Sequence, residues 1–158
     1  YFVAMCIPCC MGISHTQYRD RYVTYVSAYA EYALPVMRIG LGAVILLAGA
    51  HKLVAPEVWM KYAAPWVTAL WPDALFEFKI AMMLNGVFEV LFGLALIAGL
   101  YTTVTAGIVA LSLLAVVGDL LTGAVMTGKF VDILIRDLGL LALATGVTLR
   151  SAQHATAE

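Results

Sequence analysis

The chain has 158 residues, of which 63 % are hydrophobic and only 12 % are charged, with a formal net charge of −1. Soluble globular domains carry charges on roughly a quarter of their residues, so this composition excludes an ordinary soluble domain and predicts an integral membrane protein. The near-zero net charge provides no basic surface, which excludes nucleic acid as a partner. We expect an all-α fold: a bundle of four transmembrane helices preceded by an N-terminal interfacial helix.

Residues 1–33 form the first predicted region, which is apolar at its start. The apolar stretch is short for a membrane span and holds all three cysteines, Cys6, Cys9 and Cys10. The C-x-x-C spacing of the first two is typical of redox pairs, and His15 follows as a candidate fourth metal ligand. Two interpretations stay open: redox or metal-binding thiols, and thiols that face lipid or carry a lipid.

The second half of this region carries a regular series of tyrosines. They recur at spacings of four and three residues, which predicts one face of a helix. Tyrosine combines an apolar ring with a polar hydroxyl, so such a face suits a helix that lies among lipid headgroups. Docking against a protein partner is the alternative, because tyrosines are favoured in protein interfaces. The face consists of Tyr18, Tyr22, Tyr25, Tyr29 and Tyr32.

Residues 34–150 contain four apolar segments long enough to cross a bilayer. They cover about residues 34–54, 79–100, 104–126 and 130–149. The loop after the first segment holds three prolines and three tryptophans, which predicts short helical pieces that cap the bundle at a membrane surface. Residues 151–158 are polar and are expected to form a frayed tail.

Ionisable residues inside the predicted spans are costly in a bilayer, so each one requires a structural or functional reason. Threading the spans up and down places most of them in one layer near one end of the bundle, with Glu89 deeper. In that layer we expect Asp132 to pair with Arg136 along one helix and Asp137 to face Lys52. Arg136 would then be the centre of a buried network. The complete intramembrane set is Arg38, His51, Lys52, Glu89, Asp119, Asp132, Arg136 and Asp137.

Three segments of the chain match a known pattern: VMRIGLGAVILLAGAHKL, NGVFEVLFGLALIAGL and RDLGLLALA. From about Leu34 to Arg150 the chain resembles the DoxX family of small four-helix membrane proteins. Relatives of that kind include the small membrane subunit of an archaeal thiosulfate:quinone oxidoreductase and a methylamine-utilisation maturation protein. The positions that carry the resemblance are Arg38, Lys52, Glu89, Arg136 and Asp137.

The resemblance implies a membrane subunit of, or accessory to, a redox system for quinone-linked sulfur or thiol oxidoreduction. A quinone is the implied candidate cofactor, and no covalent cofactor is expected. If the chain belongs to such an enzyme, Glu89 or Asp137 would supply protons near the ring, with Arg136 or Lys52 stabilising the charge of the reduced quinone.

Two other functions stay open on the residues alone. The first is a structural or assembly protein that docks a larger partner or forms a homo-oligomer, with its charges only holding the helices in register. The second is a small proton-linked carrier with Glu89 on the proton path. The sequence carries no metal motif, no nucleophile triad and no phosphate-binding loop.

We expect a multi-pass location in the cell (plasma) membrane with both termini in the cytoplasm. The orientation follows from basic residues that flank the spans, and these nearly balance between the two sides. Arg19, Arg21 and Arg150 lie on the side of the termini, against Lys61, Lys79 and Lys129 on the other.

Overall fold

The computed structural model describes residues 15–72 and 77–156, and all regular secondary structure within these ranges is helical. The all-α prediction is therefore confirmed for this part of the chain. The chain divides into two compact units, residues 1–33 and 34–158, which are described separately. The predicted thiols Cys6, Cys9 and Cys10 lie outside the described residues.

The first unit contains the tyrosine-bearing segment. Helix α1 covers His15–Ser27 and a short 3₁₀ helix, η1, covers Ala30–Tyr32, so the segment forms two pieces joined by a turn instead of one helix. The rings of Tyr25 and Tyr29 contact each other, with centroids 5.4 Å apart. The side chain of Tyr18 is outside the description. The other tyrosines of the face are more than half exposed: Tyr22, Tyr25, Tyr29 and Tyr32.

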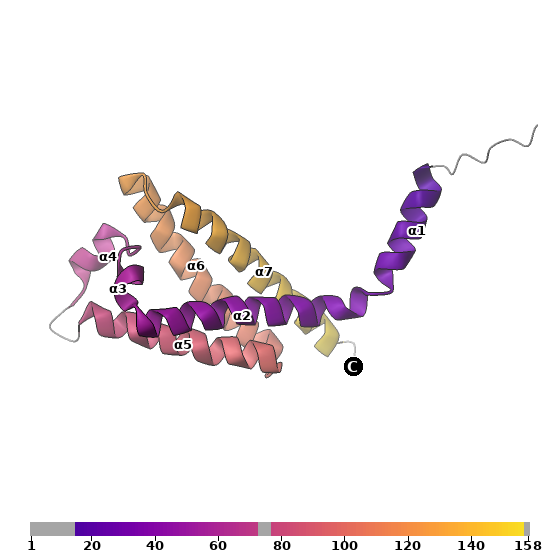
Figure 1. Ribbon diagram of the computed structural model, residues 1–158, viewed down its shortest axis with the longest axis horizontal. Coiled ribbons are helices and arrows are strands. Elements are labelled where there is room, and N and C mark those ends of the chain that lie inside the picture. The colour runs from indigo at the N-terminus through magenta and orange to yellow at the C-terminus, as the bar shows by residue number, and fades with distance from the viewer. Residues whose placement is uncertain (1–14, 73–76, 157–158) are drawn as a thin grey trace, which may run out of the picture. The chain divides into compact units, whose positions relative to one another are not determined.

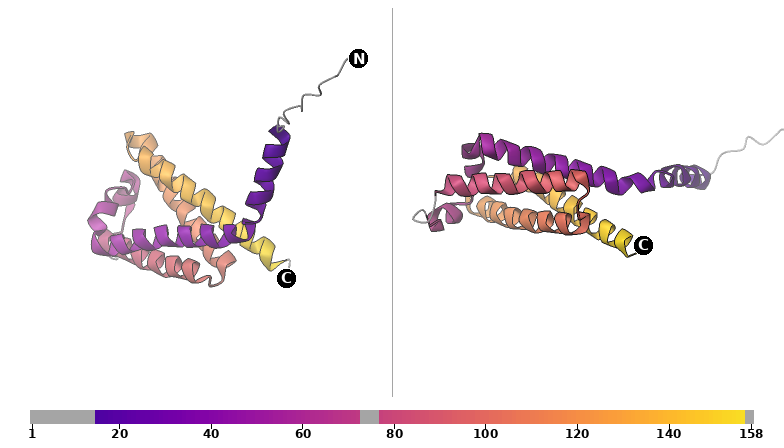
Figure 2. Two further views of the ribbon diagram at one scale, coloured as in Figure 1. Left: turned by 45° about the vertical axis from the view of Figure 1, so that its right-hand side comes forward. Right: turned by 90° about the horizontal axis from the view of Figure 1, so that it is seen from below.

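The second unit is built on four long helices, joined in chain order by a cap and two short turns. They are α2 (Ala33–Val54), α5 (Phe78–Ala98), α6 (Thr102–Thr127) and α7 (Val131–Ala155). Helices α2 and α5 lie side by side, and α6 lies against α7 (Figures 1 and 2). The bundle therefore consists of two helix pairs.

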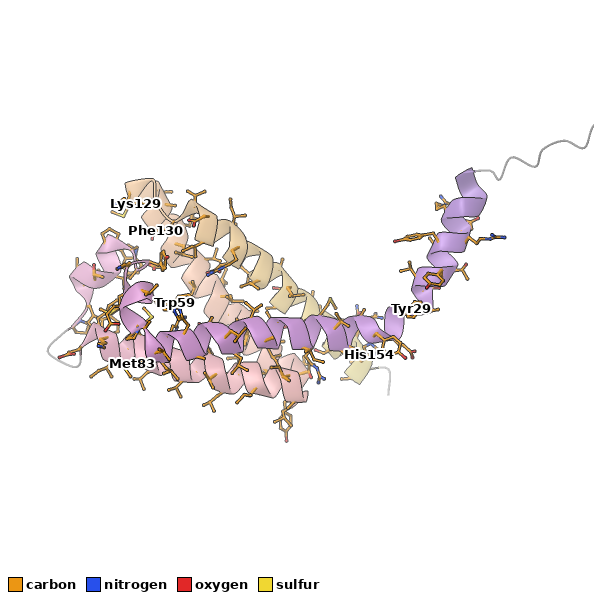
Figure 3. The ribbon with its side chains drawn as sticks, in the orientation of Figure 1. Tyr29, Trp59, Met83, Lys129, Phe130 and His154 are labelled. Atoms are coloured by element: carbon orange, nitrogen blue, oxygen red, sulfur yellow. The ribbon has the colours of Figure 1, made fainter. Side chains whose placement is uncertain are left out.

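Three of these segments are long and apolar enough to cross a membrane: residues 30–54, α5 and α6. Most of their outward side chains are apolar, as expected for surfaces that face lipid, and Figure 3 shows Met83 among them on α5. Helix α7 has the length of a span, but it carries three charged residues within its first two turns. Its apolar outer residues include Ile135 and Leu149, which are exposed.

Glycines bring α2 and α5 into close contact. A Cβ atom added at Gly42 would lie 2.8 Å from the carbonyl oxygen of Gly93, and one added at Gly49 would lie 2.6 Å from that of Gly86. These distances leave no room for a side chain at either crossing point. Such close backbone approach matters in a bilayer, because apolar side chains gain little by leaving lipid for another helix.

Prolines divide the segment between α2 and α5, as the sequence predicts. Helix α3 (Pro56–Met60) and helix α4 (Pro65–Leu70) each begin at a proline. Proline suits the first helical position because its missing N–H has no acceptor there in any case. Figure 1 shows both short helices at the same end of the bundle, beside the end of α6. Together with the residues around them they form the cap, residues 55–72.

Contacts with two long helices fix the cap. The indole nitrogen of Trp66 donates a hydrogen bond to Oγ1 of Thr122 on α6, at 2.8 Å. Glu57 on α3 forms an ion pair with Lys79 on α5, in which Nζ and Oε1 are 2.6 Å apart. The ammonium of Lys79 holds the pKa of the Glu57 carboxyl below its ordinary value.

The fully buried core lies at the other end of the bundle. Its largest side chains, Leu41, Leu96, Val109 and Val147, come from all four long helices, close to the turn between α5 and α6. Helix α7 continues past the predicted limit at Leu149 to Ala155, and Ser151 in the predicted tail is buried. One end of the bundle is thus closed by apolar packing, whereas the end beneath the cap holds the cavity described next.

Candidate functional site

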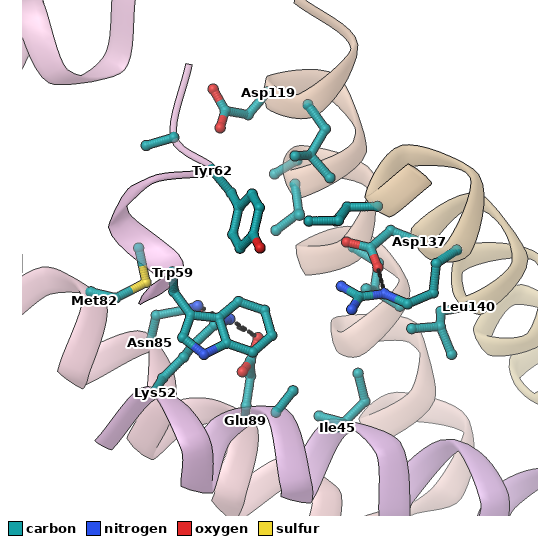
Figure 4. Close-up of a pocket in the computed structure, with 18 of the residues that line it drawn as sticks. Ile45, Lys52, Trp59, Tyr62, Met82, Asn85, Glu89, Asp119, Asp137 and Leu140 are labelled. Carbon is teal, nitrogen blue, oxygen red and sulfur yellow. Dashed lines mark hydrogen bonds and ion pairs between the residues drawn. The ribbon is translucent and has the colours of Figure 1, made fainter. Parts of the chain in front are cut away.

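A cavity of about 350 Å³ lies at the cap end of the bundle, between the four long helices and the cap. This volume is in the range of small-molecule sites. Its wall is mostly apolar and includes the aromatic rings of Trp59, Tyr62 and Phe78. Figure 4 shows its polar side chains converging from different helices. The charged groups on the wall are Lys52, Glu89, Asp119, Arg136 and Asp137.

The deepest polar feature of the cavity is an ion pair between α2 and α5. Nζ of Lys52 lies 2.5 Å from Oε1 of Glu89, and both residues are more than nine-tenths buried. The amide nitrogen of Asn85 lies 3.5 Å from the same oxygen, which makes a weak additional contact. The other carboxylate oxygen of Glu89 is buried and has no hydrogen-bond partner among the described residues. An unpaired buried acceptor is costly, so a donor brought to this position would be favourable.

A second ion pair lies on α7, across the cavity. Nε of Arg136 lies 2.8 Å from Oδ1 of Asp137, the next residue along the helix. The Asp137 side chain is buried, whereas that of Arg136 is 51 % exposed. Because Arg136 both lines the cavity and reaches the outside, we place it at the cavity mouth.

The expected pairing of the charged layer is corrected by these two contacts. The sequence predicted that Asp132 pairs with Arg136 and that Asp137 faces Lys52, but Arg136 binds Asp137 and Lys52 binds Glu89. Asp132 is exposed, does not line the cavity and forms no ion pair within the described ranges. The expected single network centred on Arg136 is therefore two pairs on different helices.

Trp59 of the cap covers the Lys52 side of the cavity. The ammonium nitrogen of Lys52 lies 4.7 Å from the centroid of the indole ring, and the guanidinium carbon of Arg136 lies 6.0 Å from it. Cations are attracted to the face of an indole ring at these distances. The ring edge also contacts Tyr62, whose ring contacts Phe130 in turn. A row of aromatic rings thus continues from the cavity to the start of α7.

Asp119 of α6 joins the cavity to the cap. Its two carboxylate oxygens each lie 3.3 Å from the backbone nitrogen of Ala64, the residue before α4. Ala64 is fully buried, so this contact satisfies an N–H group that water does not reach. Asp119 therefore has a structural role in addition to its place on the wall.

Besides Asp132, two residues of the predicted set lie outside the cavity. Arg38 on α2 places its guanidinium at Gly99, beyond the C-terminal end of α5, where a Cβ atom would collide with it. A cation is favourable at a helix C-terminus because of the helix dipole. His51 lies on the outer side of α2 and accepts a hydrogen bond from the indole nitrogen of Trp59.

Sequence reasoning missed two members of the site, Trp59 and Asn85. The three tryptophans of the cap indicated a membrane interface, and nothing in their spacing distinguished Trp59 from Trp66 or Trp71. Asn85 carried a usable signal, because it lies one helical turn before Glu89 and so on nearly the same face of α5.

The helices that carry most of this geometry also carry a family signature. The sequence model of the DoxX family matches residues 33–122, which is more than half of the chain. The chain belongs to the DoxX family. The match includes Arg38, the Lys52–Glu89 pair and Asp119 of this DoxX protein. No curated protein matches the chain, and no solved structure does so either.

The match also separates two parts of the cavity. It ends within α6, so the α7 wall of this DoxX protein, with Arg136 and Asp137, lies beyond the matched residues. Family membership and the three apolar helices make the chain an integral membrane protein.

Proposed function

We propose that this protein is a membrane subunit of, or accessory to, a quinone-linked redox system, and that the cavity receives the quinone ring. The observation that carries the proposal is the Lys52–Glu89 pair on the wall of an otherwise apolar cavity about 350 Å³ in volume. Quinones diffuse within the bilayer, so a site for them needs an apolar wall and an opening toward lipid. Arg136 at the mouth and the aromatic side chains inside suit a flat ring with polar edges.

The polar groups of the cavity fit the chemistry of such a ring. Quinone oxygens accept hydrogen bonds, and Lys52, Arg136, Asn85 and Tyr62 supply donors on the wall. When bound, a quinone would supply two-electron redox chemistry, in which its reduction consumes two electrons and two protons. The protons reach the ring through acids on the wall, for which Glu89 and Asp137 are the buried candidates. The electrons come from an oxidoreductase partner.

The proposal includes α7 as the fourth membrane span, which places both termini on one side of the plasma membrane, the cytoplasmic side. The length of α7, 25 residues, supports this topology, as does the position of its charges at the cavity end. Single cysteines in a cysteine-free background at Arg21, Lys129 and Gln153 test it with a thiol reagent that does not cross membranes. We expect the first and third to react from the same side and the second from the other.

Quinone binding is tested with the protein in lipid nanodiscs and a short-chain quinone, by measuring the dissociation constant from the quenching of tryptophan fluorescence. We expect Arg136→Gln and Lys52→Met to weaken binding by tenfold or more, since the first removes the charged guanidinium from the mouth and the second removes a donor from the wall. Lys129→Gln is the matched control, because Lys129 is exposed and does not line the cavity. Equal quinone affinities in the unsubstituted protein and all these variants would contradict a quinone site in this cavity.

A second candidate function rests on the exposed tyrosine face of the first unit. An apolar ring with a hydroxyl suits either headgroups or a protein surface, and an assembly protein would use this face to dock a larger partner. Copurification after in-cell crosslinking separates the two functions. The assembly function would be favoured if changing Tyr22 and Tyr25 to Ser abolished the crosslink to one defined partner, and if neither the unsubstituted protein nor the variant bound quinone.

A further inference from the structure

A hydrogen bond between two rings joins the outer side of α2 to the cavity wall. Within the described residues, the indole N–H of Trp59 donates to Nδ1 of His51, with the two nitrogens 3.0 Å apart. The rings meet edge to face, with centroids 6.0 Å apart. His51 is exposed and does not line the cavity, whereas Trp59 does. A solvent-accessible side chain therefore positions a wall residue.

The wall residue lies over the buried ion pair. The Trp59 ring contacts the Lys52 ammonium at 4.7 Å, and Lys52 is bound in turn to Glu89 (Figure 4). One carboxylate oxygen of Glu89 is bound by Lys52, and the other is buried without a partner in the described part of the chain. Moving the indole ring would remove its contact with the Lys52 ammonium on the cavity wall.

Protonation of His51 changes the chemistry of this contact. Neutral histidine accepts a hydrogen bond at Nδ1 only when its proton is on Nε2, whereas the protonated ring has two donors and no acceptor. Tryptophan has a donor only. On protonation two N–H groups would face each other, so the hydrogen bond would be lost and the two groups would repel each other.

Charged groups on the helices around His51 and Trp59 determine the electrostatic environment in which His51 ionises. Helix α2 contributes Lys52, and α3 contributes Glu57, which is paired with Lys79 of α5. Lys61 follows α3 directly, and α5 also contributes Glu89. Helix α7 contributes the pair of Arg136 and Asp137, with the guanidinium carbon of Arg136 6.0 Å from the centroid of the Trp59 ring. Asp119 of α6, on the same cavity wall, contacts the backbone nitrogen of Ala64. Each of these acids therefore has a partner, although the second carboxylate oxygen of Glu89 has none among the described residues.

We propose that His51 is a pH-sensitive positioning residue of the cavity. In its neutral form it holds the Trp59 ring against the Lys52 ammonium, and on protonation it releases the ring from the Lys52–Glu89 pair. The physiological consequence rests on the proposed quinone function, for which Glu89 is a proton donor. Acidification on the side of the cap would then change the contacts of the lysine that is paired with this acid.

The test is the indole N–H signal of Trp59 in ¹⁵N-tryptophan-labelled protein in nanodiscs, followed by NMR from pH 8 to pH 5. The chain has three tryptophans, and Trp59→Phe identifies the signal by its disappearance. We expect the Trp59 signal to shift as pH falls, within the range where histidine side chains ionise, as the hydrogen bond is lost. Trp66 provides an internal control, because its indole donates to the hydroxyl of Thr122, which does not ionise in this range.

His51→Gln is the matched variant, since a glutamine oxygen can accept the same hydrogen bond but does not ionise. We expect its Trp59 signal to stay constant over the pH range. A shift that persists in His51→Gln would assign the titration to another group and overturn the proposal. The proposal is also overturned if Trp59 does not shift in the unsubstituted protein, or if Trp66 shifts together with it, because the change would then be global.

This measurement needs no ligand, so it separates the positioning role from the quinone function. If Trp59 titrates through His51 while a short-chain quinone fails to bind at any pH, the positioning role stands and the proposed function fails. If the quinone binds with the same affinity at pH 8 and pH 5 in both the unsubstituted protein and His51→Gln, the quinone site stands and the regulation is overturned.

Discussion

Lys52 binds Glu89 although the two residues lie at different depths along their helices. Lys52 is within one turn of the end of α2, whereas Glu89 is in the middle of α5. The contact forms because Gly86 lies against the start of the lysine side chain: a Cβ atom there would be 3.0 Å from the Cβ of Lys52. The lysine side chain runs from that point about one turn along α5 to reach the carboxylate.

The first prediction concerns this ion pair. Lys52→Met leaves a buried carboxylate without its cation, and removing one partner of a buried pair typically costs about 3–5 kcal/mol. We expect a loss of that size in the free energy of unfolding, measured in detergent by SDS titration with circular dichroism. Lys52→Met combined with Glu89→Leu should recover most of it, since an apolar pair of similar volume is well tolerated.

Lys79→Met is the matched control for this prediction. It removes the same side chain from the other lysine–glutamate pair of the second unit, which is exposed, and exposed pairs contribute little. Equal stability of Lys52→Met and the unsubstituted protein would mean that Glu89 is neutral or finds another donor in the folded protein.

The pairing of Lys52 shows what the sequence could and could not predict. The all-α class, the apolar helices and the proline-punctuated cap follow from composition and spacing. The partner of Lys52 depends on the axial offset between α2 and α5, and this offset cannot be predicted from the charged residues alone. The spacing of the glycines does indicate the offset. Gly42 and Gly49 are seven residues apart, as are Gly86 and Gly93, and in the structure Gly42 packs against Gly93 and Gly49 against Gly86.

The pairing of Arg136 could not be predicted for a different reason. Side chains four residues apart on a helix are neighbours, which favoured Asp132, whereas adjacent residues point about 100° apart. The long arginine side chain nevertheless reaches around the helix to Asp137, the buried carboxylate, and Asp132 stays exposed. Burial therefore decided the partner, and burial depends on how α7 faces the other helices.

The second prediction concerns the contact between α2 and α5. Gly49→Ala places a Cβ atom 2.6 Å from the backbone oxygen of Gly86, so the helices must separate. Overpacking of this kind typically costs about 1–3 kcal/mol, and we expect a loss in that range in the same SDS titration. Gly40→Ala is the control on the same helix, because nothing lies within 4 Å of a Cβ atom at that position. Equal effects of the two substitutions would contradict the close helix contact.

The third prediction concerns Arg38 and the C-terminal end of α5. Gly99 has a φ of +77°, and its missing side chain leaves the space that the Arg38 guanidinium fills. Gly99→Ala should therefore be destabilising for two reasons, backbone strain of about 1–2 kcal/mol and displacement of the arginine. Gly128→Ala measures the strain alone, since Gly128 has a φ of +69° and open space around it.

A double-mutant cycle isolates the contribution of the arginine. We expect Gly99→Ala to cost more than Gly128→Ala, and the combination of Arg38→Ala with Gly99→Ala to cost less than the sum of the two single changes. Strict additivity would show that the guanidinium does not occupy this space in the membrane.

The fourth prediction concerns the pH dependence of the Glu57–Lys79 pair at the cap. The pKa of Glu57 lies below its ordinary value of 4.5 in the folded protein, mainly because Lys79 donates a hydrogen bond to the carboxylate. A lowered folded-state pKa means that the pair stabilises the protein above the unfolded-state pKa and that this contribution is lost as pH falls through the folded-state pKa. Carboxyl ¹³C NMR should show Glu57 titrating at lower pH than a free glutamate, and Lys79→Met should move the midpoint back upward. The magnitude is small because both groups are exposed, so a midpoint that does not move would indicate that water, and not Lys79, solvates the carboxylate.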